Sequence, residues 1–214
     1  MSLIAERRRE EKEQRRESVI DAAEQVFAQK GFEDSTINDV ARQARLSRAL
    51  VYFYFKDKDD VQTAITLRAL RALRRSCERA AAKHKLGIEK LVAVSRAYYD
   101  FSRSEPFYFK AIARREARQS AASVPGGYES ACIAEGGKTM RVLADAIKTG
   151  IEDGSIDATV GAPAVMAAIM WGFLHGVIQV SSSKEPLLRK AFQIDAGEMV
   201  ERSLELCRRA LAAK

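Results

Sequence analysis

The residue types that could carry out chemistry are few in this chain, and their spacing matches no catalytic or metal-binding motif. Gly137-Lys138-Thr139 resembles the end of a phosphate-binding loop, but that motif needs a glycine where the chain has Cys132. Asp153-Gly154-Ser155 resembles the middle of a calcium-binding loop. The positions where that loop needs carboxylates hold other residue types: Thr149, Ile151 and Val160.

Histidine and cysteine are also scarce. His84 and His175 are the two histidines, and no Gly-x-Ser-x-Gly motif accompanies them, so a pair of nucleophile and base has no support. Three cysteines, at positions 77, 132 and 207, are too few and too widely spaced for a disulfide framework or a zinc site. We therefore expect reduced thiols, no metal, no cofactor and no enzymatic activity.

The composition favours a helical protein with a substantial core. Of 214 residues, 47% are hydrophobic, whereas only 12 are glycine and 4 are proline, fewer turn residues than an all-β domain usually needs. The 36 Lys and Arg residues exceed the 29 Asp and Glu residues and give a net charge of +7. Residues 1–16 are charged almost throughout and contain no apolar signal segment, which predicts a cytoplasmic protein.

Apolar residues recur with the 3.6-residue period of helices, so the predicted fold class is all-α. A first helix begins within residues 6–16 and ends at Lys30, before Gly31. The later helices are predicted at 36–44, 47–54, 57–83, 87–103, 107–118, 128–152, 163–180 and 195–212, with loops at 119–127, 153–161 and 181–185.

Two of these helices are short and are capped separately. Thr36 and Ser47 each stand where an N-cap residue is needed, and about three residues join the two helices. Ala41 is small at the point where the helices must approach each other. This arrangement predicts a helix-turn-helix.

The segment between Arg16 and Val61 resembles the DNA-binding domain of the TetR family of regulators. The agreement in residue type and spacing extends over three helices and includes Ala22, Ala23, Phe27, Gly31, Thr36, Asp39, Ala41, Tyr52, Tyr54, Phe55 and Lys58. The resemblance implies a three-helix DNA-binding domain over residues 1–58 and a long connecting helix. Residues 59–214 would then form a helical effector-binding and dimerisation domain.

The resemblance also implies roles for individual residues in binding double-stranded operator DNA. Arg48 would read a guanine through two hydrogen bonds, and Ala49 or Leu50 would contact a thymine methyl group. Ser47 and Phe53 would face the major groove. The expected phosphate contacts, which fix register without reading sequence, are Thr36, Tyr52, Tyr54 and Lys58. For Tyr52 and Phe53, packing in the three-helix core is the alternative.

Arg45 and Ala49 depart from the family pattern, which usually has glycine at both positions. A non-glycine residue tolerates positive φ poorly, so the turn at Arg45 is either built differently or modestly strained. Arg45 also adds a cation near the DNA. The preceding segment, residues 7–16, intersperses bases with acids, which is typical of a solvated helix; a basic arm on DNA is the alternative.

The second half of the chain is rich in aromatic and methionine side chains. They suit a small-molecule pocket with few polar partners, and they equally suit a helical core. Because the resemblance implies an effector site here, the candidate ligand-binding residues are Tyr98, Phe101, Phe107, Met140, Met170, Trp171 and His175.

Residues 162–180 are almost wholly apolar and approach the length of a membrane span. Gly172 and Gly176 would let another helix approach closely. We interpret the helices at 163–180 and 195–212 as a homodimer interface, with no membrane association, because flanking interfacial bases are missing.

The predicted function is a ligand-responsive, homodimeric transcriptional repressor that a small-molecule effector releases from its operator. The alternatives are a regulator whose C-terminal domain binds a protein partner or no ligand, and a helical enzyme. The sequence leaves open the operator, the effector, the regulated genes and the choice between repression and activation.

Overall fold

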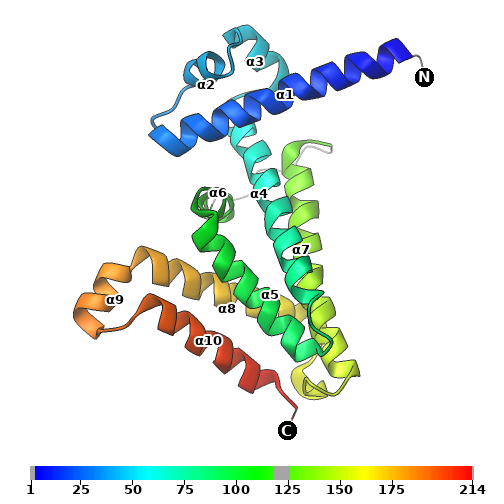
Figure 1. Cartoon of the computed structure of the whole chain (residues 1–214), viewed down its shortest axis with the longest axis vertical. Helices are drawn as coiled ribbons and strands as arrows, with labels where there is room; N and C mark the ends of the chain where they lie inside the picture. The colour runs from blue at the N-terminus through cyan, green and yellow to red at the C-terminus, as the bar shows by residue number, and fades with distance from the viewer. Residues whose placement is uncertain (1–2, 118–125, 214) are drawn as a thin grey trace. The chain divides into compact units, whose positions relative to one another are not determined.

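The computed structural model describes residues 3–117 and 126–213 (Figure 1). Over these residues the chain forms ten α-helices, one short 3-10 helix and no β-strand, which confirms the all-α prediction. The helices are α1 (Leu3–Lys30), α2 (Ile37–Gln43), α3 (Arg48–Tyr54), α4 (Lys58–Ala81), α5 (Gly87–Ser104), α6 (Pro106–Ala117), α7 (Tyr128–Glu152), α8 (Pro163–Ser183), α9 (Glu185–Phe192) and α10 (Ala196–Leu211).

The chain divides into two compact units, and each is discontinuous in sequence. The first unit comprises Met1–Ala69 and Lys110–Cys132, and the second comprises Leu70–Phe109 and Ile133–Lys214. The predicted domain boundary after residue 58 stays a prediction. In the division by compactness, residues 110–117 and 126–132 belong with the N-terminal helices. Among them, Arg114 pairs with Glu33 at 2.6 Å, and the Tyr128 ring stacks on Phe55 at 5.9 Å between centroids.

The core of the first unit is built from the apolar stripes of α1 to α4. Five apolar residues form the inner face of α1 and are all buried: Val19, Ile20, Ala23, Val26 and Phe27. Val40 and Ala41 of α2 and Val51 of α3 are buried too. Figure 1 shows α2 and α3 together on one side of α1, as a helix-turn-helix requires.

Arg68 of α4 anchors that helix to α1. Its guanidinium donates to Asp21 at 2.6 Å and to Glu24 at 3.2 Å, and it also binds the carboxylate of Glu17. The Arg68 side chain is only 22% exposed, so these bonds are partly shielded from water.

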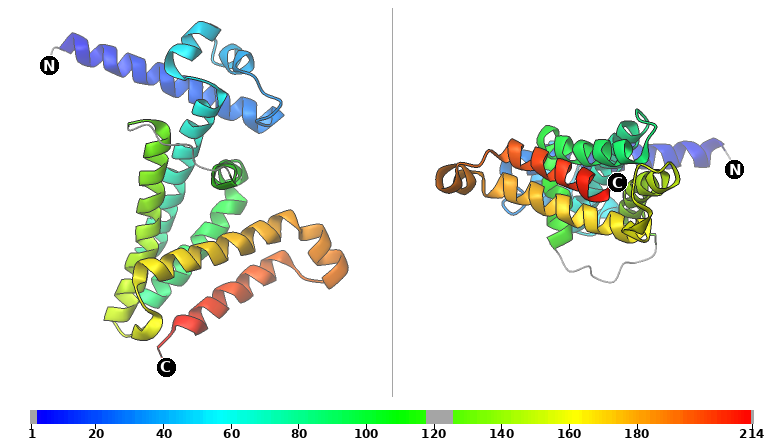
Figure 2. Two further views of the ribbon diagram at one scale, coloured as in Figure 1. Left: turned by 180° about the vertical axis from the view of Figure 1, so that it is seen from behind. Right: turned by 90° about the horizontal axis from the view of Figure 1, so that it is seen from below.

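In the second unit, α8 and α10 lie side by side and α9 connects them, as both views in Figure 2 show. Helix α5 packs against both, and the core includes Leu91, Ile147, Leu174, Ile178 and Val200. Arg96 of α5 forms a two-fold hydrogen-bonded ion pair with Glu201 of α10.

The N-terminus of α5 packs directly on the backbone of α7. A Cβ added at Gly87 would lie 1.9 Å from the amide nitrogen of Gly150, so only glycine fits there. The free amides of α5 are capped by the loop after α7: Gly87 N donates to Asp153 Oδ2 at 2.8 Å, and Ile88 N donates to Ser155 Oγ at 3.1 Å. The segment that resembled a calcium loop is therefore a helix cap.

Two boundaries near the C-terminus differ from the prediction. Residues 181–183, predicted as loop, extend α8, because the hydroxyls of Ser181 and Ser182 both donate to the carbonyl of Ile178 at 2.9 Å. Helix α9 was not predicted; it begins at Glu185, with Pro186 in its first turn. Residues 118–125, which include most of the predicted loop 119–127, lie outside the described residues.

Candidate functional site

The helix-turn-helix begins with a tightly capped α2. The Thr36 hydroxyl accepts from Asp39 N at 3.2 Å and donates to Asp39 Oδ2 at 2.7 Å, while Thr36 N donates to the same carboxylate at 3.0 Å. Lys30 pairs with Asp39 at 2.8 Å. The hydrogen bonds from Lys30 and Thr36 hold the pKa of Asp39 well below its usual range. Thr36 thus has a structural role, and its predicted phosphate contact stays a prediction.

The turn between α2 and α3 keeps the glycine-like conformation despite its arginine. Arg45 has φ +56°, in the left-handed region that a side chain disfavours. The second of the two predicted possibilities, modest strain, therefore describes this turn. The Arg45 side chain is exposed.

Helix α3 presents a mainly exposed outer face. Ser47 caps its N-terminus by accepting from Leu50 N at 3.2 Å, and Val51 holds its inner face in the core. Phe53 is 66% exposed and Tyr52 is 43% exposed, so neither packs in the core. Phe55, which directly follows α3, is buried in the core instead.

The candidate contacts on this face lie close to one another. The Arg48 guanidinium donates to Tyr52 Oη at 3.5 Å and lies 5.4 Å from that ring's centroid. Ala49 is exposed beside Arg48, whereas Leu50 and Tyr54 are half-buried. The Tyr54 ring packs edge-on against Phe53 at 5.1 Å.

Lys58 lies apart from this face and serves the fold. Its ammonium donates to the carbonyl oxygens of Phe32 at 2.7 Å, Ser35 at 2.9 Å and Glu33 at 3.2 Å. These three bonds use every N–H of the ammonium and tie the loop before α2 to the start of α4. A phosphate contact by Lys58, which stays a prediction, would have to replace one of them.

Four of the seven predicted ligand residues are apolar side chains of the second unit that are at least half-buried. Phe101 and Met170 are buried, and Phe107 and Met140 are half-buried.

The other three form a cluster around His175, which we call the histidine cluster. Tyr98 Oη lies 2.6 Å from His175 Nδ1, and the rings of Trp171 and Phe109 lie 5.5 and 5.9 Å from the imidazole. Burial lowers the pKa of His175, which keeps the ring neutral at pH 7. Gln179 completes the cluster at 3.3 Å from Nε2.

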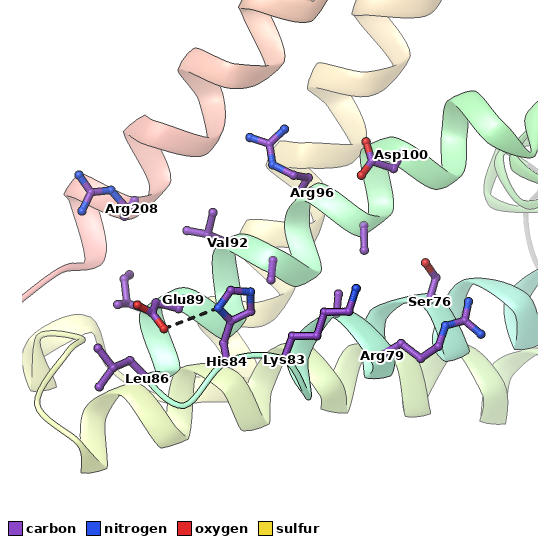
Figure 3. A pocket seen from close by; sticks show the side chains of 14 residues that line it. Ser76, Arg79, Lys83, His84, Leu86, Glu89, Val92, Arg96, Asp100 and Arg208 are labelled. Atoms are coloured by element: carbon purple, nitrogen blue, oxygen red, sulfur yellow. Dashed lines mark ion pairs between the residues drawn. The ribbon is translucent and has the colours of Figure 1, made fainter.

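Sequence reasoning missed a cleft of about 880 Å³ in the second unit, which we call the basic cleft (Figure 3). Its apolar lining includes Leu86, Ile88 and Val92. The charged residues around it come from α4, the turn after α4, α5 and α10: Arg79, Lys83, His84, Glu89, Arg96, Asp100 and Arg208.

The cations of the basic cleft differ in their availability. Arg96 pairs with Glu201, and Arg208 pairs with Glu205 at 2.9 Å. Arg79 and Lys83 form no ion pair or hydrogen bond through their side chains with any described residue. The four-residue spacing of Arg79 and Lys83 could have indicated two cations on one side of the chain. The same spacing is also typical of bases near a helix C-terminus, where the helix dipole favours positive charge.

Helix α8 leaves large apolar side chains uncovered. Its exposed residues include Val165, Ile169, Phe173 and Val180, and nothing lies within 4 Å of a Cβ added at Gly172 or Gly176. By length and composition α8 could cross a membrane, although an apolar helix of a soluble protein passes the same test. Only 28% of its most apolar window is buried.

The helix-turn-helix, with an arginine-bearing exposed face on its second helix, defines the first unit as that of a DNA-binding protein. Residues 19–65 match the family model described as bacterial regulatory proteins, tetR family. The chain is 45% identical over 49 residues to the HTH-type transcriptional regulator HbdR of Aromatoleum sp. (strain CIB). It is 43% identical over 54 residues to the HTH-type transcriptional repressor BepR of Brucella suis biovar 1 (strain 1330).

These matches cover 23% and 25% of this chain and span only 21% and 26% of the two relatives' own lengths. They lie in the DNA-binding segment, so residues 19–65 are similar to the DNA-binding segment of the TetR family of transcriptional regulators. This match confirms the predicted resemblance of the segment to the TetR family, and the names of both relatives describe transcriptional regulators.

Solved structures of the same fold cover nearly the whole chain. The transcriptional regulator FadR from Bacillus subtilis, solved with stearoyl-CoA, matches 88% of this chain and 95% of its own, with a TM-score of 0.67 and 18% identity. AibR, solved with isovaleryl coenzyme A and operator DNA, matches 90% and 97%, with a TM-score of 0.63 and 14% identity. At these identities the likeness concerns the fold.

Proposed function

We propose that this chain is a transcriptional repressor that binds operator DNA as a homodimer and is released from it by a small-molecule effector. The observation that carries the DNA-binding role is the exposed face of α3, where Arg48 stands beside Tyr52 on a helix whose inner side is fixed by Val51. An arginine at that place can donate two hydrogen bonds to guanine O6 and N7.

The test begins by selecting bound duplexes from a random pool with the intact chain. Arg48→Ala should then weaken binding to the selected duplex by about 1–3 kcal/mol and relax preference at one base pair. Arg141→Ala, which removes an exposed arginine of the second unit, is the matched control and should change neither property. Unchanged affinity and preference in Arg48→Ala would refute the base-reading role.

The homodimer is supported by the uncovered face of α8. Its apolar residues and its two open glycines form one stripe, which suits close packing of a second helix. We expect Ile169→Asp with Phe173→Asp to give a monomer in sedimentation at micromolar concentration. Leu187→Asp on α9 is the control, because Leu187 is 54% exposed but lies outside the proposed interface. A wild-type chain that sediments as a monomer, with and without DNA, would exclude the dimer.

The effector class that fits best is an acyl-CoA. Two proteins of this fold were solved with stearoyl-CoA and isovaleryl coenzyme A. The basic cleft of this chain supplies apolar contacts near Val92 and two cations without ion pairs, Arg79 and Lys83, which suit an apolar chain joined to phosphate groups. The aromatic histidine cluster is the second candidate for the acyl group.

Acyl-CoAs of graded chain length, free coenzyme A and free fatty acids are the probes. Trp171 is the only tryptophan, so its fluorescence reports a ligand that reaches the histidine cluster. Arg79→Gln with Lys83→Gln should weaken acyl-CoA binding while leaving fatty acid binding unchanged. Absence of binding by every probe would favour the alternatives, a protein partner or no ligand.

Release from the operator would operate through α4, which follows directly after the helix-turn-helix and ends at Ala81. The last turns of α4 line the basic cleft. An effector that shifts α4 would change the spacing of the two recognition helices in the dimer, which must match successive major grooves about 34–36 Å apart. By thermodynamic linkage, operator DNA must weaken effector binding by the same factor as the effector weakens DNA binding. Unequal factors would contradict this coupling.

A further inference from the structure

The N-terminal part of α1 segregates its charges onto opposite faces. At 3.6 residues per turn, five of the six bases between residues 7 and 16 fall within a sector of about 120° around Lys12. The sixth, Arg7, lies outside the sector and pairs with Glu11 at 3.2 Å. This sector, which we call the basic face, contains Arg8, Arg9, Lys12, Arg15 and Arg16. The acids lie outside it: Glu6, Glu10, Glu11, Glu13 and Glu17. The alternation of signs in the sequence is therefore a separation of signs in space.

The basic face points toward the recognition helix. Lys12 Nζ lies 5.2 Å from the ring centroid of Phe53, the exposed aromatic residue of α3. One turn later, the Arg16 guanidinium lies 4.5 Å from the ring centroid of Tyr128. Figure 1 shows the N-terminal part of α1 running past α3. The contact of Lys12 with Phe53 places at least that cation of the basic face beside the exposed face of α3.

Three of the five bases have no partner in the described part of the fold. The side chains of Arg8, Arg9 and Arg15 are exposed and form no ion pair or hydrogen bond within residues 3–117 and 126–213. Like charges four residues apart on a helix repel each other, as Arg8 and Lys12 do. A cluster of exposed cations without such partners points to a polyanionic partner.

We propose that the basic face of α1 is a second DNA contact, which binds backbone phosphates flanking the bases that α3 reads. This inference rests on the proposed function. The helix from residue 3 to residue 16 is about 20 Å long, which matches roughly six base pairs of duplex. The contact is independent of base sequence, lengthens the binding site and adds to its salt dependence.

The test variant is Arg8→Gln, Arg9→Gln and Arg15→Gln together. It leaves Lys12 on Phe53 and Arg16 on Tyr128, and glutamine favours helix nearly as well as arginine, so α1 should stay folded. The charge-matched control is Lys184→Gln, Arg189→Gln and Lys190→Gln, which removes the same three charges from exposed positions of the second unit.

Both variants and the intact chain are titrated with the selected duplex over a range of salt concentrations. The titrations are repeated with a shorter duplex, from which about six base pairs have been removed at each end. In the α1 variant, the slope of log K against log salt should fall by about 0.9 for each phosphate that the protein no longer neutralises. Trimming the duplex should weaken the intact chain and the control, and should leave the α1 variant nearly unaffected. Base preference should be unchanged in all three.

If the α1 variant keeps the slope and the length dependence of the intact chain, the inference is overturned while the proposed function stands. If the two triple variants show the same decrease in slope, the effect belongs to net charge and the inference is likewise overturned. If the intact chain selects no duplex, the proposed function fails, and the inference fails with it.

Discussion

Replacing Gly87 by alanine tests the close approach of α5 to α7. The added Cβ would lie 1.9 Å from Gly150 N, 2.2 Å from Gly150 Cα and 2.6 Å from the carbonyl oxygen of Ala146. All three neighbours are backbone atoms, which cannot rotate away, and carbon atoms in contact normally keep about 3.5–4.0 Å. The two helices must therefore move apart by more than about 1 Å, and the caps from the loop after α7 must stretch.

The expected cost is about 3 kcal/mol, the upper end for forcing an extra methyl group into a packed site. For a chain of this size, that cost corresponds to a fall of roughly 6–12 °C in Tm. Since Leu86, Ile88 and Glu89 line the basic cleft, the same displacement should also weaken any ligand bound there.

Thermal unfolding followed by Trp171 fluorescence reports the second unit directly, because Trp171 is the only tryptophan. Gly136→Ala is the matched control: it makes the same substitution in a helix interior, but nothing lies within 4 Å of the added Cβ. That control should be neutral or stabilising by up to about 1 kcal/mol through helix propensity. A Gly87→Ala chain whose Tm lies within about 1 °C of the wild type would refute the reasoning, because such a shift corresponds to less than about 0.5 kcal/mol.

Three further predictions concern charge and thiols. Arg68→Ala removes the hydrogen bonds from Arg68 to three carboxylates of α1. The substitution should destabilise the first unit by about 2 kcal/mol in urea unfolding followed by circular dichroism. Because the bond from Lys30 lowers the pKa of Asp39, the stabilisation from Asp39 is present at pH 7 and is lost as the pH falls below about 4. The stability difference between wild type and Asp39→Asn should accordingly shrink toward pH 2. Burial raises the pKa of Cys77 to about 12 and of Cys207 to about 11, so iodoacetamide at pH 8 should label neither thiol until denaturant is added.

Local patterns predicted the helices of the first unit well, because the signals lie within a few residues of one another. The N-caps Thr36 and Ser47 and the buried stripe of α1 need only helical periodicity and the chemistry of orphan amides. The strain at Arg45 was also open to prediction, since a turn of this kind demands positive φ whatever residue occupies it.

The interactions that sequence reasoning missed depend on the path of the chain. Lys58 meets carbonyl oxygens 23 to 26 residues before it, and no pattern near Lys58 indicates them. Helix α9 is only eight residues long and follows three serines, which usually signal a loop; here the hydroxyls of Ser181 and Ser182 satisfy the carbonyl of Ile178. The charge separation on α1 was present in the sequence, but the position of Phe53 beside Lys12 shows which way it points.

The discontinuity of the first unit has a consequence for the order of folding during synthesis. The helix-turn-helix is complete once residue 54 has emerged, but Phe55 and Glu33 find their partners only in segment 110–132. At roughly 5–20 residues per second, the ribosome needs several seconds to travel from residue 69 to residue 132. During this time the helix-turn-helix lacks these contacts, and a fragment cut after residue 69 would lack them permanently.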